Sequence, residues 1–341
     1  MTQPTQMNAL VQRQDGYADT QTGPNIADLS PFLVHEAIPL PQPGEGQALI
    51  KVHLAAVNPS DIHFIKGEYG QPRVKGVPAG FEAVGEVIAG DTPFVGQRVS
   101  FFATASGTWA QYAMTDSAGL VPCRPDLAEE DAAGQLVNPL TAIAMFDIVK
   151  ESGADSFVLN AAGSQLGKLL IALGRDHGIK PIAVVRRSAQ AKALKALGAA
   201  EVIVTGELDP LGSAQTLFQT HKPRILLDAV GDQFTSDLFF AMPSHTRWVT
   251  YGKLSTDAPA LTQLGQLIFQ NKQIEGFWLT RWMKQVDQAR VMQAFVEIQE
   301  RFVSGKWKTD VAGIVPLSQA IDKLPEVLAM SDGKAFIDPR A

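Results

Sequence analysis

In the second half of the chain, short apolar runs alternate with segments that have the period of a helix. The first run is followed by leucines at the i, i+3, i+4, i+7 spacing of one helix face, namely Leu166, Leu169, Leu170 and Leu173. The strand candidates are residues 157–160, 182–185, 201–205, 224–228, 248–251 and 273–277. Six strands that alternate with helix-length segments predict an α/β fold with a doubly wound parallel sheet. After the second strand, Ser188 is placed to cap a helix and Gly198 to end it.

The first 140 residues have a different pattern, because they hold 13 of the 21 prolines and 14 of the 29 glycines. Helices tolerate that density poorly, so we expect short strands and turns, with strand candidates at 33–36, 47–56 and 83–88. The tail returns to strand-like pieces at 312–315 and 335–337 around a helix candidate at 317–330, and should pack back on the N-terminal region. We therefore predict two domains, a β-rich one from residues 1–130 and 305–341 and an α/β one from residues 131–304.

Composition narrows the possible partners and the compartment. The net charge of −6 argues against nucleic acid or an anionic membrane as the main partner. A single cysteine, Cys123, excludes a disulfide within the chain and favours a reducing compartment. Residues 1–8 lack the features of a secretory signal, and no apolar run approaches the roughly 18 residues of a membrane span. We expect a soluble, cytoplasmic protein.

The segment after the first parallel strand has the small residues of a dinucleotide-binding turn. Counting back from Gly167, the three glycine positions of such a turn hold Ala162, Ser164 and Gly167. Small residues there let backbone N–H groups reach a pyrophosphate at the start of a helix. The predicted cofactor contacts are Ala162, Gly163, Ser164, Gln165 and Leu166. The alternative is a tight strand–helix turn that binds no ligand.

Basic residues at the end of the second strand favour NADPH over NADH. Arg186 and Arg187 stand where an acidic residue would bind the ribose hydroxyls of NAD, and no acid occurs between His177 and Ala200. A guanidinium group suits a 2′-phosphate because it combines charge with two parallel donors. The alternative is a solvated basic helix face, which fits Lys192 and Lys195 better than the two arginines.

Three blocks follow one another in order, Ala-Val-Asn-Pro-Ser-Asp at 56–61, Lys-Gly-Glu-Tyr-Gly at 66–70 and Gly-Phe-Glu-Ala-Val-Gly at 80–85. Together they resemble the medium-chain dehydrogenase/reductase superfamily, in its zinc-free quinone oxidoreductase branch. Residues 137–142 and 276–282 are more narrowly similar to the 2-enoyl thioester reductases. The resemblance, which runs from about residue 47 to 340, implies a Rossmann-type sheet plus a partly barrel-like, GroES-like catalytic domain. It also implies an active site in the cleft between the domains, and a homodimer.

The resemblance also allows the zinc ligands of related proteins to be compared with the residues of this chain. Zinc-dependent relatives bind the catalytic metal with a cysteine and with the histidine of a Gly-His-Glu block, and the corresponding places here are residues 58–61 and Phe81. Their structural zinc needs four cysteines, whereas this chain has one. We therefore expect no zinc. Without a Lewis acid, reduction of an activated C=C bond is easier to support than alcohol–aldehyde chemistry.

The resemblance makes Tyr69 the candidate for proton delivery or enolate stabilisation, whereas the residues alone favour an aromatic that packs a turn. Asn58 and Thr141 carry polar groups that could orient the nicotinamide amide, or else form an Asn-Pro turn and a helix start. Further cofactor contacts are expected at the ends of the fifth and sixth strands, where ligands gather in parallel sheets. These contacts are Tyr251, Gly252, Phe277 and Trp278. The segment from Arg73 to Gly80 departs from the family pattern, which bears on the substrate.

The leading hypothesis is an NADPH-dependent, zinc-free oxidoreductase that reduces the C=C bond of enoyl thioesters or enones. The first alternative is an NADPH:quinone oxidoreductase on the same scaffold, which needs no proton from Tyr69. A third possibility is a non-catalytic NADPH-binding protein.

Overall fold

The computed structural model describes residues 4–103, 106–330 and 333–341. The chain forms two compact units, Met1–Asn138 with Phe295–Ala341, and Pro139–Ala294. We call the first the β-rich unit and the second the parallel-sheet unit. No helix in the described part of the chain combines the length and the apolar composition that a membrane crossing requires.

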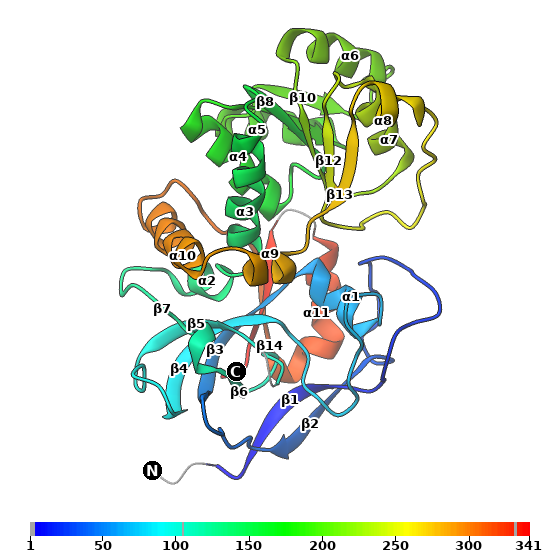
Figure 1. Cartoon of the computed structure of the whole chain (residues 1–341). Helices are drawn as coiled ribbons and strands as arrows, with labels where there is room; N and C mark the ends of the chain where they lie inside the picture. Colours follow the sequence, from blue (N-terminus) through cyan, green and yellow to red (C-terminus); the bar gives the residue numbers. More distant parts are fainter. Residues whose placement is uncertain (1–3, 104–105, 331–332) are drawn as a thin grey trace. The chain divides into compact units, whose positions relative to one another are not determined.

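The parallel-sheet unit contains the six strands that the apolar runs predict (Figure 1). They are β8 (Ser156–Leu159), β9 (Lys180–Val185), β10 (Glu201–Val204), β11 (Ile225–Asp228), β12 (Arg247–Thr250) and β13 (Gln273–Gly276). All neighbouring strands are parallel, in the order β10-β9-β8-β11-β12-β13. The strand order therefore reverses between β8 and β11, which is where open sheets of this kind bind ligands.

Helices cover both faces of this sheet, as predicted. They include α3 (Asn138–Glu151), α4 (Gln165–His177), α5 (Ala191–Leu197), α6 (Pro210–His221), α7 (Gln233–Ala241) and α8 (Gly265–Phe269). Two further helices follow the last strand, α9 (Leu279–Gln285) and α10 (Gln288–Val303), and α10 continues into the β-rich unit. Phe157 of β8 packs on Phe146 of α3, with ring centroids 6.1 Å apart. Its neighbour Val158 lies in a buried cluster with Phe218 of α6 and Phe239 of α7. Successive side chains of a strand point to opposite faces, so the two contacts mark two covered faces.

The prediction that Ser188 caps α5 is wrong. A 3₁₀ turn, Ser188–Gln190, comes first, and Gln190 is the residue that immediately precedes α5. The predicted end of this helix is confirmed, because Gly198 has a φ of 126° and its N–H donates to the carbonyl of Leu194. A left-handed φ of this kind favours glycine, which has no Cβ to clash.

The described part of the β-rich unit contains a hairpin, a mixed sheet, three α-helices of its own and the second half of α10. The hairpin joins β1 (Gln6–Gln12) to β2 (Leu33–Pro39). The sheet strands are β3 (Gln47–Val57), β4 (Glu82–Gly90), β5 (Arg98–Phe102), β6 (Tyr112–Asp116), β7 (Val121–Pro122), β14 (Val311–Pro316) and β15 (Lys334–Asp338). The helices are α1 (Pro59–Ile65), α2 (Glu129–Ala133) and α11 (Ala320–Ala329). The strands of the sheet follow the order β14-β15-β3-β4-β5-β7, and β6 also pairs with β3. Because β15 pairs with β3, the C-terminal tail packs on the N-terminal region, as expected.

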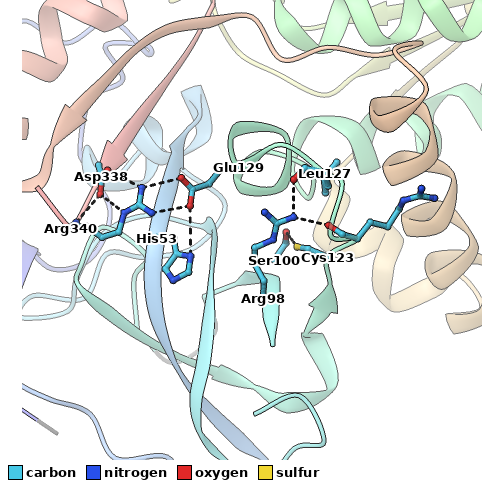
Figure 2. A network of polar contacts seen from close by, with 9 residues as sticks. His53, Arg98, Ser100, Cys123, Leu127, Glu129, Asp338 and Arg340 are labelled. Atoms are coloured by element: carbon cyan, nitrogen blue, oxygen red, sulfur yellow. Dashed lines mark hydrogen bonds and ion pairs between the residues drawn. The ribbon is translucent and has the colours of Figure 1, made fainter. Parts of the chain in front are cut away.

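An ion-pair network holds the C-terminus of the chain (Figure 2). The guanidinium of Arg340 donates to both carboxylate oxygens of Glu129 at 3.0 Å and to those of Asp338 at 3.0 Å. Nδ1 of His53 lies 3.7 Å from Glu129, yet burial lowers the pKa of this histidine. The network joins the end of β15 and the middle of β3 to the start of α2.

Candidate functional site

The turn that follows β8 has the geometry expected of a dinucleotide-binding turn. Ser164 precedes α4, and its hydroxyl accepts a hydrogen bond from Gly167 N at 3.1 Å. A Cβ at Gly167 would lie 2.6 Å from the carbonyl oxygen of Ala162, so the helix can start this close to the strand only with glycine there. The predicted contacts, from Ala162 to Leu166, all lie at this strand–helix junction. Helix N-termini of this kind present free N–H groups to anions.

Asn160 fixes the start of this turn, a role that the sequence analysis missed. Its amide donates to Asp228 Oδ1 at 2.5 Å and to Thr235 Oγ1 at 3.0 Å, and its carbonyl oxygen accepts from Ala229 N at 2.7 Å. Oδ2 of Asp228 accepts from the indole of Trp248 at 2.8 Å. Asn160 directly follows β8 and Asp228 ends β11, so this network joins the two strand ends at the point where the order reverses. The only sequence signal was a polar residue at the end of each apolar run.

The basic pair lies beside the dinucleotide turn. Arg186 and Arg187 are both exposed directly after β9. Ala162 N donates to the carbonyl of Val184 at 3.2 Å, which holds the turn against the end of that strand. A Cβ at Gly163 would meet the amide of Gln190 at 2.4 Å, so the turn also touches the 3₁₀ segment that follows the arginines. The structure therefore brings the predicted pyrophosphate and 2′-phosphate residues to one edge of the sheet, and adds Gln190 to them.

The predicted contacts at the fifth and sixth strands also lie at the carboxyl edge of this sheet. Tyr251 N donates to Asp228 O at 2.8 Å, and a Cβ at Gly252 would lie 2.8 Å from Ala229 O. The Tyr251 hydroxyl is buried without a hydrogen-bond partner in the described residues, and burial, with Asp228 nearby, raises its pKa. Phe277 follows the end of β13, one residue before Trp278, which precedes α9. Thr141 is buried in the first turn of α3.

In the β-rich unit, Tyr69 belongs to a cluster of three aromatic rings. Its ring centroid lies 5.2 Å from that of Phe81 and 6.4 Å from that of Phe64, and the Phe64 ring is nearly perpendicular to it at 86°. Edge-to-face and tilted contacts of this kind are favourable for aromatic rings and hold the Tyr69 ring in place. All three side chains are half-buried.

Asn58 and Glu82, which are close in the sequence to Phe64 and Phe81, belong to a buried polar cluster. Asn58 donates to Glu82 at 2.9 Å and accepts from Lys334 Nζ at 2.6 Å, and Lys334 also donates to Glu82 at 3.1 Å. The other oxygen of Glu82 accepts from the backbone N–H groups of Leu136 and Val137 at 3.0 and 2.9 Å. Both ends of the Asn58 amide are therefore already engaged within this unit. Its predicted contact with nicotinamide stays a prediction.

Asp61 completes the cluster through its carboxyl group, of which one oxygen accepts from Asn58 N at 2.7 Å. The other oxygen is buried without a partner in the described residues. Burial raises the pKa of this carboxyl to about 7; the Asn58 hydrogen bond opposes this shift, and the Glu82 carboxylate adds to it. Sequence reasoning missed Asp61, Glu82 and Lys334 as members of this cluster, because nothing local indicates that Glu82 of β4 forms an ion pair with Lys334 of β15.

Two domain families match the chain. Residues 44–125 match the alcohol dehydrogenase GroES-like domain, and residues 166–297 match the zinc-binding dehydrogenase domain. A mitochondrial enoyl-[acyl-carrier-protein] reductase from Arabidopsis thaliana is 32% identical over 333 residues, which cover 92% of this chain and 84% of that protein. The chain belongs to the medium-chain dehydrogenase/reductase superfamily, in its enoyl and quinone reductase branch.

Solved structures agree with this membership of the medium-chain superfamily. The crystal structure of a proposed NADPH:quinone reductase from Mesorhizobium loti is 46% identical, with a TM-score of 0.95, and covers 99% of this chain and 100% of that one. The mitochondrial 2-enoyl thioester reductase heterodimer from Candida tropicalis shares the fold at 21% identity, with a TM-score of 0.79 over 98% of this chain and 99% of that one.

Some members of the medium-chain superfamily bind zinc, but the residues that stand at the ligand positions in this chain do not suit a zinc site. Within the described residues, no group of three or more His, Cys, Asp or Glu side chains is placed to hold a metal ion. Glu82, next to the place of the histidine ligand in zinc-dependent relatives, already binds an ammonium group and two backbone N–H groups. Phe81, at the place of a histidine ligand, packs instead on Tyr69 and Phe64.

Proposed function

We propose that this protein is an NADPH-dependent, zinc-independent reductase of activated C=C bonds, with 2-enoyl thioesters as favoured substrates. The observation that carries the proposal is Tyr69, held beside Phe81 where zinc-dependent relatives place a metal-binding histidine. The similarity to the enoyl-[acyl-carrier-protein] reductases along most of the chain supports the same activity.

The parallel-sheet unit has the features that NADPH needs. The turn from Ala162 to Leu166 would hold the pyrophosphate, and the close approaches at Gly167 and Gly252 leave the strand ends free of side chains. Arg186 and Arg187 would bind the 2′-phosphate, because guanidinium groups combine positive charge with paired donors. NADPH, when bound, supplies the hydride that reduces the β-carbon of the substrate.

The proposed role of Tyr69 is to supply the proton that completes the reduction. Reduction at the β-carbon moves charge onto the carbonyl oxygen of the substrate, and the α-carbon must gain a proton to complete the saturated product. The Tyr69 hydroxyl would donate that proton, and water would return one to the tyrosinate.

The test is Tyr69→Phe, assayed by NADPH oxidation with a crotonyl thioester. We expect turnover to fall about 100-fold or more, since positioned acid–base groups contribute factors of about 10² to 10⁴. Tyr17→Phe is the matched control, because Tyr17 is 59% exposed and should tolerate loss of its hydroxyl. Unchanged turnover in Tyr69→Phe would remove the proposed role. Metal analysis of the purified protein should find no stoichiometric zinc.

The second candidate is an NADPH:quinone reductase, favoured by the 46% identity with the Mesorhizobium loti protein. Quinone reduction takes its protons from solvent and needs no Tyr69 donor. A crotonyl thioester and a small quinone compared at equal NADPH separate the two activities, because only the first should depend on the Tyr69 hydroxyl.

We further propose a homodimer formed through the edge of the parallel sheet, in a cytoplasmic protein. Strand β13 lies at the end of the sheet order, and the adjoining α8 exposes Ile268 and Phe269 by 74% and 86%. Unpaired strand edges and clustered apolar side chains are typical of association surfaces. The mass measured by light scattering should be about twice 36.7 kDa, and Phe269→Glu should reduce it to that of one chain.

A further inference from the structure

The long loop between β1 and β2 is bound to the segment that carries Tyr69. We call residues 13–32 the β1–β2 loop and residues 66–76 the Tyr69 loop. Backbone hydrogen bonds join them at Gly16 and Arg73, in both directions at 3.0 and 3.1 Å, and at Ala18 N to Gly67 O at 2.9 Å. The two loops therefore form one structural element, although they are separated by β2, β3 and α1 in the sequence.

Arg73 makes the first side-chain clamp of this element. Its side chain is only 6% exposed, and its guanidinium donates to Gly16 O at 3.0 Å, Gln14 Oε1 at 2.7 Å and Asp15 O at 3.2 Å. A planar fork with several donors can satisfy three acceptors at once, which an ammonium group cannot do in the same geometry. A Cβ at Gly67 would lie 2.6 Å from Cζ of Arg73, so the guanidinium lies directly against the backbone two residues before Tyr69.

Glu68 makes the second clamp, immediately before Tyr69. One carboxylate oxygen accepts from Thr22 N at 2.7 Å and Thr22 Oγ1 at 2.8 Å, and the other accepts from Gly23 N at 3.0 Å. Burial alone would raise the pKa of Glu68, but the two Thr22 hydrogen bonds and the nearby Lys66 hold it below its ordinary value. Lys66 donates in turn to the carbonyls of Gly23 and Asn25.

Tyr69 thus lies between two clamps that both fasten onto the β1–β2 loop. A misplacement of about 1 Å in a reacting group can cost about 100-fold in rate. We propose that Arg73 and Glu68 are positioning residues for Tyr69, acting through the β1–β2 loop; this inference rests on the proposed role of Tyr69 as proton donor.

The test is a double-mutant cycle of Arg73→Lys and Tyr69→Phe, in which turnover of a crotonyl thioester is measured by NADPH oxidation. Arg73→Lys keeps the positive charge but replaces the planar guanidinium group with an ammonium group. We expect it to lower kcat about 10- to 100-fold when Tyr69 is present and less than about twofold in the Tyr69→Phe background. The solvent isotope effect on kcat should rise in Arg73→Lys, because proton transfer becomes slower, while KM for NADPH stays unchanged. Arg13→Lys, an exposed arginine of the same loop, is the matched control.

Two results separate the possible failures. If Tyr69→Phe is impaired and Arg73→Lys lowers kcat by the same factor in both backgrounds, the positioning role is overturned and the proposed function stands. If Tyr69→Phe alone turns over the thioester normally, the proposed function fails, and this inference fails with it. Should Arg73→Lys not fold, Gln14→Ala removes one acceptor of the same fork. We then expect a smaller loss of kcat, which must also vanish in the Tyr69→Phe background; a loss that persists there overturns the positioning role.

Discussion

The Nζ atom of Lys334 lies 3.1 Å from Oε1 of Glu82, although the two residues are 252 positions apart. Both side chains are buried, and the same ammonium group also holds the carbonyl oxygen of Asn58. In this unit, a lysine from the last strand therefore supplies positive charge beside the segments that align with the metal ligands of zinc-dependent relatives.

Lys334→Met should destabilise the protein by about 3–5 kcal/mol, because it leaves the Glu82 carboxylate buried without its cation. The double variant Lys334→Met/Glu82→Gln should recover part of that loss, since neither partner is then charged. The free energy of unfolding in urea gives both values. Lys323→Met, on the exposed face of α11, is the control. Equal stability of the two Lys334 variants would contradict this account of the pair.

Asp61 should make the stability of the protein depend on pH. Its pKa in the folded protein, about 7, is above its ordinary value of 3.8, so the folded state keeps a proton that the unfolded chain releases. The stability that the neutral carboxyl contributes is complete below pH 3.8 and is lost as the pH rises to about 7. The loss is at most about 1.4 kcal/mol per pH unit.

Asp61→Asn should remove this pH dependence, so the variant gains stability relative to the parent between pH 4 and 7. Urea unfolding at several pH values measures the difference. Asp91→Asn, an exposed aspartate in the same unit, should leave the profile unchanged. A parallel profile for Asp61→Asn and the parent would show that Asp61 is ionised in the folded protein.

Gly167→Ala should weaken NADPH binding by about tenfold or more. The added Cβ would lie 2.6 Å from Ala162 O, so α4 must move away from the turn that we propose binds the pyrophosphate. Fluorescence titration with NADPH measures the change. Gly119→Ala is the matched control, because nothing lies within 4 Å of a Cβ there. Normal affinity in Gly167→Ala would place the pyrophosphate elsewhere.

The variant Arg186→Ala/Arg187→Ala should lose most of the preference for NADPH over NADH, by about 10- to 100-fold in kcat/KM. Hydrogen bonds to charged groups contribute about 1.5–3 kcal/mol each, and only NADPH carries the 2′-phosphate. NADH turnover should stay within about twofold of the parent. Lys192→Ala tests the competing interpretation of a basic helix face: a similar loss there would mean that general charge, rather than the arginine pair, selects the cofactor.

Local patterns in the sequence predicted the parallel-sheet unit well. Each apolar run became a strand of the six-stranded sheet, and the small residues from Ala162 to Gly167 formed the strand–helix turn. The arginine pair follows β9 as expected. These features depend on contacts between residues close in the sequence, or on a regular alternation of strands and helices. The misplaced cap at Ser188 shows the limit of such rules, since a 3₁₀ turn can replace a helix start at little cost.

The sequence by itself therefore determined the α/β class, the tight strand–helix turn and the position of the arginine pair, and its family resemblance singled out Tyr69 for the proposed chemistry. Only the tertiary structure decided which distant residues meet: Arg73 and Glu68 with the β1–β2 loop, and Asn58, Asp61, Glu82 and Lys334 in the buried polar cluster. The physical reason is that a buried charge is tolerated only where the fold brings its partners to it. Those partners come from distant strands and loops, and no local period of hydrophobic and polar residues records which of them will meet.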